Sequence, residues 1–331
     1  MPEGPEVRKF GDILRANVIN RIITKCTIKK GRYIKKVFDG YQTLIDSLPV
    51  KITDIKNKGK FTYMILESVN DSNKVLYLLN SLGMSGAWTV LKSSGKCINT
   101  LKYDDTEFSL KIFEARRKEG IFCYPRVLEY IGNDSMDQWF QYAYNNLNVQ
   151  FELDNDDYLN FHDQRNFGTI KIIDSKTDLE KKLNEIGSDI MFMSRDDFVK
   201  ILKSKIKIYS NKYIGNIIVN QKVVSGIGNY LRADILYMSR ISPFHKLKDV
   251  TEEDMNNIYK NALALIWGDY NKEYGIKKGY IAKDIKLPSD YNRDFFVYMQ
   301  DMDINGYKVK KDELFEGSQK RFIHWVEEIQ I

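Results

Sequence analysis

The chain has 331 residues, enough for two domains, and its 43% hydrophobic and 29% charged residues are typical of a soluble globular protein. No apolar run approaches the length of a membrane span, and the N-terminal segment lacks the apolar stretch of a signal peptide. Three scattered cysteines without a CxxC spacing and three dispersed histidines argue against a clustered zinc site and indicate a reducing compartment.

The net charge of +6 is concentrated in two stretches. Residues 21–38 and residues 198–233 each contain seven lysines or arginines and no acidic residue. A single basic run is typical of a solvated surface. Two acid-free runs, both interleaved with apolar residues, favour binding to the phosphate backbone of a nucleic acid.

The first segment, MPEGPEV, holds two of the six prolines. Val7, Phe10 and Leu14 follow at helical spacing and predict a helix directly behind the terminus. One interpretation is an exposed end that tolerates Pro and Glu near a first helical turn. The other is chemical. Removal of Met1 would leave Pro2 as a secondary amine, partly neutral at physiological pH, that can attack carbonyl-like carbon and form a Schiff base.

The first half of the chain is predicted to be rich in strands. Alternating Phe61, Tyr63 and Ile65 predict a strand at 60–67, and β-like runs predict further strands at 75–80, 147–153, 157–163 and 169–173. Residues 92–145 break this spacing, and we interpret them as an insertion without an assigned role. We expect the β-rich domain to cover residues 1–177.

Helical spacing begins near residue 178 and predicts a helical domain over 178–294. Its predicted helical segments are 179–187, 196–205, 213–224, 229–239 and 251–267. The last of these opens with a pair typical of a capping box, Thr251 and Asp254. Residues 295–331 return to short strands around Asn305-Gly306, which is typical of a hairpin turn.

Two motifs present side chains that fit a gap in a base stack. HDQRNFG at 162–168 carries Arg165 and Phe167 two residues apart, so both can project together from a strand or a loop. SLGMSG at 81–86 places Met84 between two glycines, where an apolar side chain is otherwise unhelpful. The alternative for the first motif is a core phenylalanine beside a surface arginine.

Two further motifs suggest phosphate contacts. SGIGNYL at 225–231 joins two predicted helices, and its glycines permit a turn whose N–H groups face outward at the start of the next helix. Asn229 adds a side-chain donor, although glycines between helices often only make the turn. NKGKF at 57–61 puts Lys60 at a turn leading into a strand, which is ordinary by itself.

Taken in order, MPEGPEV, GKF, LGMSG, DxRxFG and GIGNYL resemble the formamidopyrimidine-DNA glycosylase and endonuclease VIII family, over nearly the whole chain except the 92–145 insertion. GIGNYLRADILY and the missing cysteines are most similar to the zinc-less endonuclease VIII-like branch, known from animals and giant viruses. The resemblance implies an α+β fold with an N-terminal β-sandwich domain, a helix–two-turn–helix domain and a zinc-less β-hairpin finger. It also implies a nuclear or cytoplasmic site of DNA replication, and the Lys-, Asn- and Ile-rich composition is compatible with a viral origin.

The resemblance also implies a mechanism. Pro2 would be the Schiff-base nucleophile at C1′ of a flipped-out nucleotide. Glu3 would be the adjacent acid, and Glu6 a supporting carboxylate. The imine would then make the 2′ proton acidic, so that β- and δ-elimination cut the strand.

The family's DNA contacts map onto two groups of residues. The positions that fill the vacated base stack are Met84, Arg165 and Phe167. The positions that hold phosphates are Lys60, Gly228, Asn229 and Arg321.

Two departures from the family pattern are visible. No cysteine follows Cys123, so the finger must hold by packing alone, and Ser81 precedes LGM where the bacterial branch commonly has His. We expect a monomeric DNA glycosylase and AP lyase of base excision repair, without metal or cofactor, acting on damaged DNA, duplex or single-stranded. Its expected substrates are oxidised pyrimidines and ring-opened purines. The alternatives are an 8-oxoguanine-directed glycosylase and a non-catalytic protein that binds damaged DNA.

Overall fold

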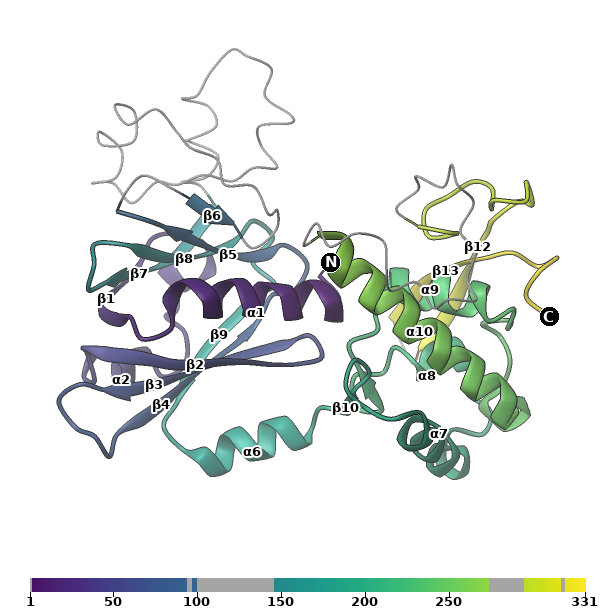
Figure 1. The fold of residues 1–331 in the computed structure, drawn as a ribbon, viewed down its shortest axis with the longest axis horizontal. Helices are drawn as coiled ribbons and strands as arrows, with labels where there is room; N and C mark the ends of the chain where they lie inside the picture. Colours follow the sequence, from purple (N-terminus) through teal and green to yellow (C-terminus); the bar gives the residue numbers. More distant parts are fainter. Residues whose placement is uncertain (1, 94–96, 100–145, 274–294, 317–318) are drawn as a thin grey trace, which may run out of the picture. The chain divides into compact units, whose positions relative to one another are not determined.

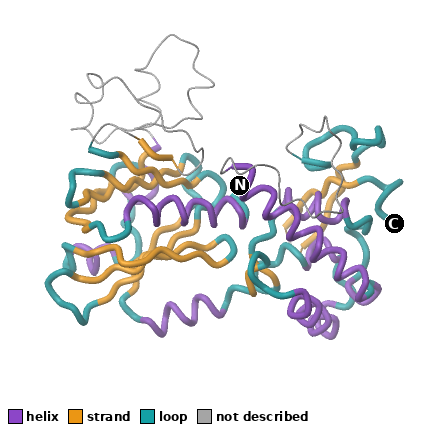
Figure 2. The backbone as a smooth tube through the Cα atoms, in the orientation of Figure 1, coloured by secondary structure: helices purple, strands orange, loops and turns teal. Residues whose placement is uncertain are grey.

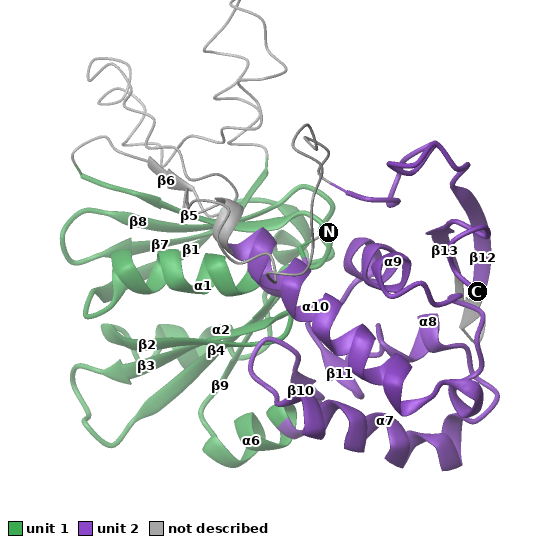
Figure 3. Cartoon of the chain, turned by 45° about the vertical axis from the view of Figure 1, so that its right-hand side comes forward, with its two compact units in different colours: residues 1–2, 6–183 green, residues 3–5, 184–331 purple. Residues whose placement is uncertain are grey.

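The computed structural model describes residues 2–93, 97–99, 146–273, 295–316 and 319–331 (Figure 1). The predicted insertion at 92–145 therefore lies outside the described residues, apart from 92, 93 and 97–99. The chain forms two compact units, shown in green and purple in Figure 3. Unit 1 comprises Met1–Pro2 and Glu6–Leu183, and unit 2 comprises Glu3–Pro5 and Asn184–Ile331.

Unit 1 is built on an antiparallel sheet whose described strands follow the order β6-β5-β8-β7-β1-β2-β3-β4-β9 (Figure 1). All five predicted strands are confirmed. The strand bounds are β1 Ile22–Ile28, β2 Val50–Lys58, β3 Phe61–Ser68, β4 Val75–Ser81, β5 Gly86–Leu91, β6 Cys97–Asn99, β7 Leu147–Leu153, β8 Tyr158–Asp163 and β9 Thr169–Ile173. Between them lie the short helices η1 (Gly31–Ile34) and α2 (Tyr41–Ile45), and α6 (Lys176–Asn184) follows β9.

One hydrophobic core joins both halves of this sheet to helix α1 (Gly4–Val18). The predicted apolar face of α1 is confirmed, because Val7, Phe10 and Leu14 are all buried in that core. Trp88 on β5 packs against the rings of Phe151 and Phe161, at centroid distances of 6.0 and 5.1 Å. Aromatic pairs at these distances add to the stabilisation that comes from burying their area. The surface loops of unit 1 are therefore anchored to a well-packed hydrophobic core.

Helices dominate unit 2 (Figure 2). Its elements are β10 Ser188–Asp189, α7 Arg195–Tyr209, α8 Ile214–Ile217, β11 Val224–Ser225, α9 Asn229–Met238, η2 Leu247–Asp249, α10 Glu252–Glu273, β12 Lys310–Glu316 and β13 Gln319–Trp325. The predicted capping box before α10 is confirmed. The Asp254 N–H donates to Thr251 Oγ1 (3.1 Å) and the Thr251 N–H donates to Asp254 Oδ2 (2.9 Å). Among the described helices, none combines the length and apolar character needed to cross a membrane.

The predicted helix over 213–224 is wrong in its second half. Only α8 is helical, and the chain then turns, because the N–H groups of Val223 and Val224 both donate back to the carbonyl of Asn220. Val224 and Ser225 instead pair in parallel with β10. The β-branched valines fit this extended pairing better than a helix.

The C-terminal hairpin is confirmed, but its position differs from the prediction. Strands β12 and β13 pair in antiparallel register from Lys310↔Trp325 to Glu316↔Gln319, so the paired strands begin after Asn305-Gly306 and do not flank it. Asn305-Gly306 does form a turn, closed by an isolated bridge between Met302 and Lys308. The turn forms because the Asp303 carboxylate accepts N–H bonds from Asn305 (2.9 Å) and Tyr307 (2.8 Å).

Candidate functional site

The start of helix α9 binds the side chain of Glu3. One carboxylate oxygen accepts hydrogen bonds from the N–H groups of Gly228 (2.6 Å) and Leu231 (3.4 Å), and the other accepts from Tyr230 (3.0 Å). Glu3 is 1% exposed. Free N–H groups and the positive end of the helix dipole both stabilise an anion at this position. The geometry therefore fixes the side chain of Glu3 at the start of α9, directly after Pro2 in the chain.

A close approach of two glycines fixes this segment. The Gly4 N–H donates to the carbonyl of Gly226 (2.8 Å), and a Cβ on Gly4 would lie 2.9 Å from the Cα of Gly226. Gly226 has a φ of +108°, which residues with a side chain rarely adopt. Its own N–H donates to the side chain of Gln221, which also bonds the carbonyls of Val219 and Ile227. Both glycines are thus needed to bring Glu3 onto α9.

The turn SGIGNYL was interpreted above as a phosphate site, and the structure changes that interpretation. The N–H groups at the start of α9 are occupied by the Glu3 carboxylate, including that of Gly228. The half-buried side chain of Asn229, the first residue of α9, is left as the candidate phosphate ligand at this turn.

Three buried side chains of α9 hold the C-terminal segment. Asp234 accepts N–H bonds from residues 296, 297 and 298, at 3.0, 3.0 and 3.2 Å. The Tyr237 hydroxyl donates to Asp303 (2.8 Å). The guanidinium of Arg232 donates to the carbonyls of Phe322 (2.9 Å) and Gly215 (3.3 Å). Arg232 is 0% exposed, so this member of the basic run 198–233 is part of the core and not of a phosphate-binding surface.

Arg321 lies on β13, opposite Leu314 and next to Phe322, whose carbonyl Arg232 holds. Its side chain is half-buried. The contact from Arg232 therefore fixes the backbone beside Arg321.

Tyr298 is a residue of this region that the sequence interpretation missed. Burial, followed by the negative charge of Glu3, raises the pKa of its hydroxyl. Its ring contacts those of Tyr230 and His324 at 6.3 and 5.2 Å. Only the fold reveals Tyr298 as a neighbour of Glu3.

In unit 1 the structure brings the three predicted stack-filling residues onto two adjoining loops. Met84 lies in the loop between β4 and β5 and is 43% exposed, while Phe167 lies between β8 and β9 and is 55% exposed. The Arg165 guanidinium stands 5.2 Å from the centre of the Phe167 ring. A Cβ on Gly83 (φ +60°) would lie 2.7 Å from the backbone of Phe167, so the loops are in direct contact.

The carboxylate of Asp163 ties these two loops together. It accepts hydrogen bonds from the Ser85 hydroxyl and from the N–H groups of Arg165 and Gly168. The Arg165 N–H also donates to Ser85 Oγ (2.9 Å). Asp163 is buried, so water does not compete for these hydrogen bonds. The exposed Arg165 and Phe167 therefore project from a rigid loop and not from the core.

The remaining predicted residues lie elsewhere. Lys60 is half-buried in the two-residue turn between β2 and β3, beside Gly59 with a φ of +55°. Glu6 is half-buried in the first turn of α1, and Pro2 is half-buried just before it. The structure thus confirms the predicted turn position of Lys60.

Two side chains of types that often take part in catalysis, His162 and Cys26, are buried. Burial lowers the pKa of His162 well below its ordinary value, so the imidazole inside the HDQRNFG motif is neutral. Burial raises the pKa of Cys26 to about 12, so its thiol is unreactive. In the part of the chain that the structure describes, no three His, Cys, Asp or Glu side chains cluster as a metal site would require.

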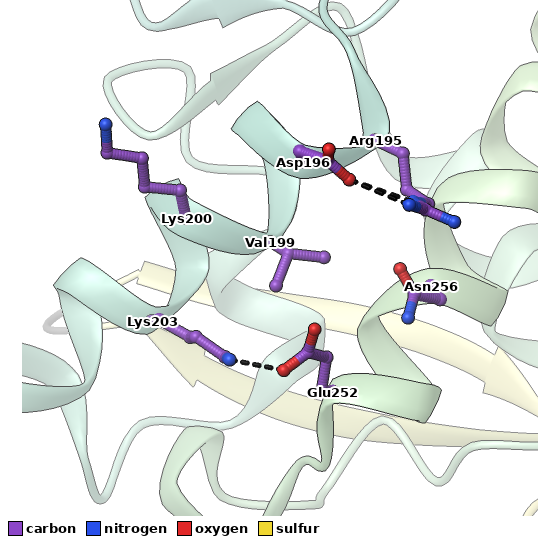
Figure 4. Close-up of a pocket in the computed structure, with 7 residues that line it drawn as sticks. All are labelled: Arg195, Asp196, Val199, Lys200, Lys203, Glu252 and Asn256. Atoms are coloured by element: carbon purple, nitrogen blue, oxygen red, sulfur yellow. Dashed lines mark hydrogen bonds and ion pairs between the residues drawn. The ribbon is translucent and has the colours of Figure 1, made fainter.

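Figure 4 shows a pocket of about 370 Å³ in unit 2, formed by side chains of α7 and α10. It contains none of the predicted site residues. Its carboxylates pair with neighbouring cations, as Arg195–Asp196 at 3.0 Å and Lys203–Glu252. It therefore has no concentration of one charge, and we assign it no function. Its lining residues are Arg195, Asp196, Val199, Lys200, Lys203, Glu252 and Asn256.

A strand-rich unit with an exposed Arg–Phe pair and a helical unit with a helix-bound glutamate define a protein of the α+β class. Comparison with known families makes this specific. Residues 1–170 match the formamidopyrimidine-DNA glycosylase N-terminal domain, and residues 192–271 match the formamidopyrimidine-DNA glycosylase H2TH domain. The chain belongs to the formamidopyrimidine-DNA glycosylase family, and it is a DNA glycosylase with AP lyase activity.

Individual relatives agree with this assignment. The chain is 27% identical over 270 residues to a formamidopyrimidine-DNA glycosylase of Mycoplasma genitalium, covering 80% of this chain and 74% of that one. It is 26% identical over 297 residues to the Rickettsia africae enzyme, covering 87% and 88%. These relatives are bacterial and give no support to a nuclear or viral origin.

Solved structures share the fold. MutM in complex with DNA containing carbocyclic 8-oxo-G matches with a TM-score of 0.66 at 16% identity, covering 99% of each chain. Lactococcus lactis Fpg in complex with DNA containing an abasic site matches with a TM-score of 0.63 at 17% identity, again covering 99% of each chain. The predicted α+β architecture, with a sheet domain and a helical domain, is confirmed.

Proposed function

We propose that this glycosylase removes oxidised bases from DNA through a Schiff base on Pro2 and then cuts the strand by β- and δ-elimination. The observation that carries the proposal is the fixed carboxylate of Glu3, which lies next to Pro2 in the chain and is bound by the start of α9. A surface glutamate near a frayed terminus would not be 1% exposed with three backbone donors. The second interpretation of MPEGPEV, the chemical one, is therefore favoured.

The proposed chemistry conserves protons. The neutral amine of Pro2 bonds to C1′ and the bond from C1′ to the damaged base breaks. The amine nitrogen releases one proton as it bonds to carbon, and the Glu3 carboxylate can accept this proton and pass it to the leaving base or to the sugar oxygen. Formation of the Schiff base also breaks the bond from C1′ to the sugar-ring oxygen, and the second of these two leaving groups takes its proton from water. Proton transfer of this kind contributes ~10²–10⁴-fold to a rate. Glu6 supports this exchange from the first turn of α1.

The stack-filling role of Met84, Arg165 and Phe167 is supported by their exposure and shared rigid base. Apolar and planar cationic side chains can occupy the gap that a flipped nucleotide leaves. Lys60, Asn229 and Arg321 are proposed to hold the phosphates around the lesion, with the Arg321 guanidinium able to make two parallel hydrogen bonds. Damaged DNA is the proposed partner of a monomer that uses no cofactor.

The hairpin finger is proposed to fold without zinc. No cysteine follows Cys123, and the segment is instead supported by buried Asp234 and Asp303 and by a hydrophobic cluster that includes Leu314 and Trp325. These contacts supply the anchoring that a metal would otherwise provide.

The favoured substrates are oxidised pyrimidines and ring-opened purines, on the interpretation that GIGNYLRADILY resembles the endonuclease VIII-like branch. An 8-oxoguanine preference is the alternative, and the MutM structure named above was solved with such a lesion. The test compares single-turnover excision from duplexes that contain thymine glycol, formamidopyrimidine or 8-oxoguanine. Excision of the first two faster than the third is expected. The reverse order would contradict the substrate proposal, and binding without cleavage of any duplex would contradict the catalytic one.

A further inference from the structure

Asn166 stands between Arg165 and Phe167 and has a left-handed backbone, with a φ of +56°. We propose that Asn166 is a positioning residue, which holds the Arg165–Phe167 pair in the conformation that enters the base stack. The inference rests on the proposed stack-filling function and deepens it. Neither the family motif DxRxFG nor any charge pattern singles out this position.

The side chain of Asn166 is held from two sides. Its Oδ1 accepts hydrogen bonds from Asn148 Nδ2 (2.9 Å) and from the N–H of Arg32 (3.0 Å). Its backbone carbonyl accepts a further bond from the Arg32 guanidinium (3.2 Å). A single amide oxygen therefore connects the loop to strand β7 and to η1.

Asn148 gives this connection a rigid base. It is 2% exposed, and its Oδ1 accepts the N–H of Asp163 (2.6 Å), the residue whose carboxylate ties the two stack-filling loops together. Its carbonyl accepts the N–H of Lys29 (2.9 Å). The amide pair thus joins the loop to the basic segment 21–38.

Gly31 makes room for the amide pair. Its φ is +78°, and a Cβ there would collide with the Asn148 amide nitrogen and with Asn166 Oδ1. Asparagine itself suits the position, because among residues with side chains it is one of the few that visit the left-handed region readily. The left-handed backbone and the hydrogen bonds of the side chain therefore both favour asparagine at position 166.

The physical consequence is preorganisation. Arg165 and Phe167 are exposed, so without support they would sample many conformations and would lose that freedom on entering DNA. A loop already fixed in the bound form avoids this loss. Single-stranded DNA has no continuous stack to fill, so the benefit is specific to duplex substrates.

Three substitutions separate the two contributions of Asn166. Asn166→Ala removes the acceptor and disfavours the left-handed backbone. Asn166→Gly restores only the backbone, and Asn166→Asp restores both the backbone preference and the acceptor oxygens. Single-turnover excision is measured on matched duplex and single-stranded substrates, with thermal unfolding as the check on folding.

We expect the Ala variant to lose about 30-fold on duplex, the lower end of the sum of two hydrogen bonds and a backbone cost, with excision from single strands unchanged. The Gly variant should lie between the Ala variant and the wild type, and the Asp variant should approach the wild type. Gly31→Ala, which displaces the same amide pair from the other side, should also lower the duplex rate selectively. Unchanged duplex excision in the Ala variant would overturn the proposal, as would equal losses on both substrates.

The triple variant Met84→Ala, Arg165→Ala, Phe167→Ala distinguishes this inference from the proposed function beneath it. If the triple variant loses duplex excision but Asn166→Ala does not, the positioning role alone is overturned. If the triple variant keeps its duplex rate, the stack-filling function fails and the role of Asn166 fails with it.

Discussion

Glu3 shows how much one side chain can depend on residues far along the chain. The sequence identifies an acid next to a candidate amine nucleophile, but its three N–H donors lie more than 220 positions away, at Gly228, Tyr230 and Leu231. No periodicity links them. The residue type was therefore predictable, whereas the N–H groups that bind it could be found only from the fold.

Glu3→Gln is the substitution that tests this residue. The amide cannot accept and return a proton, and its NH₂ would face a backbone N–H, so base excision should fall ~10²–10⁴-fold. Cleavage at a pre-formed abasic site needs no departing base to be protonated, so it should retain much of its rate. Glu6→Gln serves as the matched control and should lose less excision than Glu3→Gln. Equal excision by Glu3→Gln and the wild type would reduce Glu3 to a helix-capping residue.

At the scale of elements, α9 links the Glu3 site to the C-terminal segment: Arg232 bonds strand β13, while Asp234 and Tyr237 bond residues that precede β12. The hydrophobic pattern of NYLRADILY predicted this helix correctly. It did not reveal that the polar residues point into the core. Buried arginine and aspartate are rare unless bonded, and their partners lie between about 60 and 90 residues further along the chain.

Asp234 is expected to make the stability of the folded protein depend on pH. Burial raises its pKa from the ordinary 3.8 to about 6, although three backbone N–H groups oppose the shift. Between about pH 4 and pH 6 the unfolded chain is ionised at this residue while the folded protein keeps the proton, so the stability contributed by Asp234 falls as pH rises. A shift of about two units corresponds to roughly 2–3 kcal/mol.

The comparison is between the wild type and Asp234→Asn, which cannot titrate but keeps one acceptor oxygen. Urea unfolding at several pH values gives both free energies of unfolding. The wild-type value minus the variant value should fall between pH 4 and pH 6 and stay constant above pH 7. A difference that is flat, or that rises with pH, would show that Asp234 is not held in its protonated form.

For the whole molecule, sequence patterns predicted the order of a strand-rich part, a helical part and a hairpin. Strands β3, β4, β7, β8 and β9 were predictable from their apolar runs, and the burial of β3 and β9 alternates along the strand while β4, β7 and β8 are buried along almost their whole length. The hairpin turn was placed too early, because Asn305-Gly306 forms a local turn stabilised by Asp303 and not the connection of β12 to β13. The basic run 198–233 favours phosphate-backbone binding by its sequence, but its last basic residue, Arg232, lies in the core.

The central claim is that the amine of Pro2 attacks the damaged nucleotide. Borohydride reduction during reaction with abasic-site DNA would trap that intermediate as a covalent adduct, because it converts an imine to a stable amine. Digestion followed by mass spectrometry of the cross-linked peptide then locates the bond. We predict that the adduct lies on Pro2 of the processed N-terminus, and that Pro2→Gly or retention of Met1 weakens or abolishes it. An adduct mapped to Lys60 or to any other internal lysine would contradict the account.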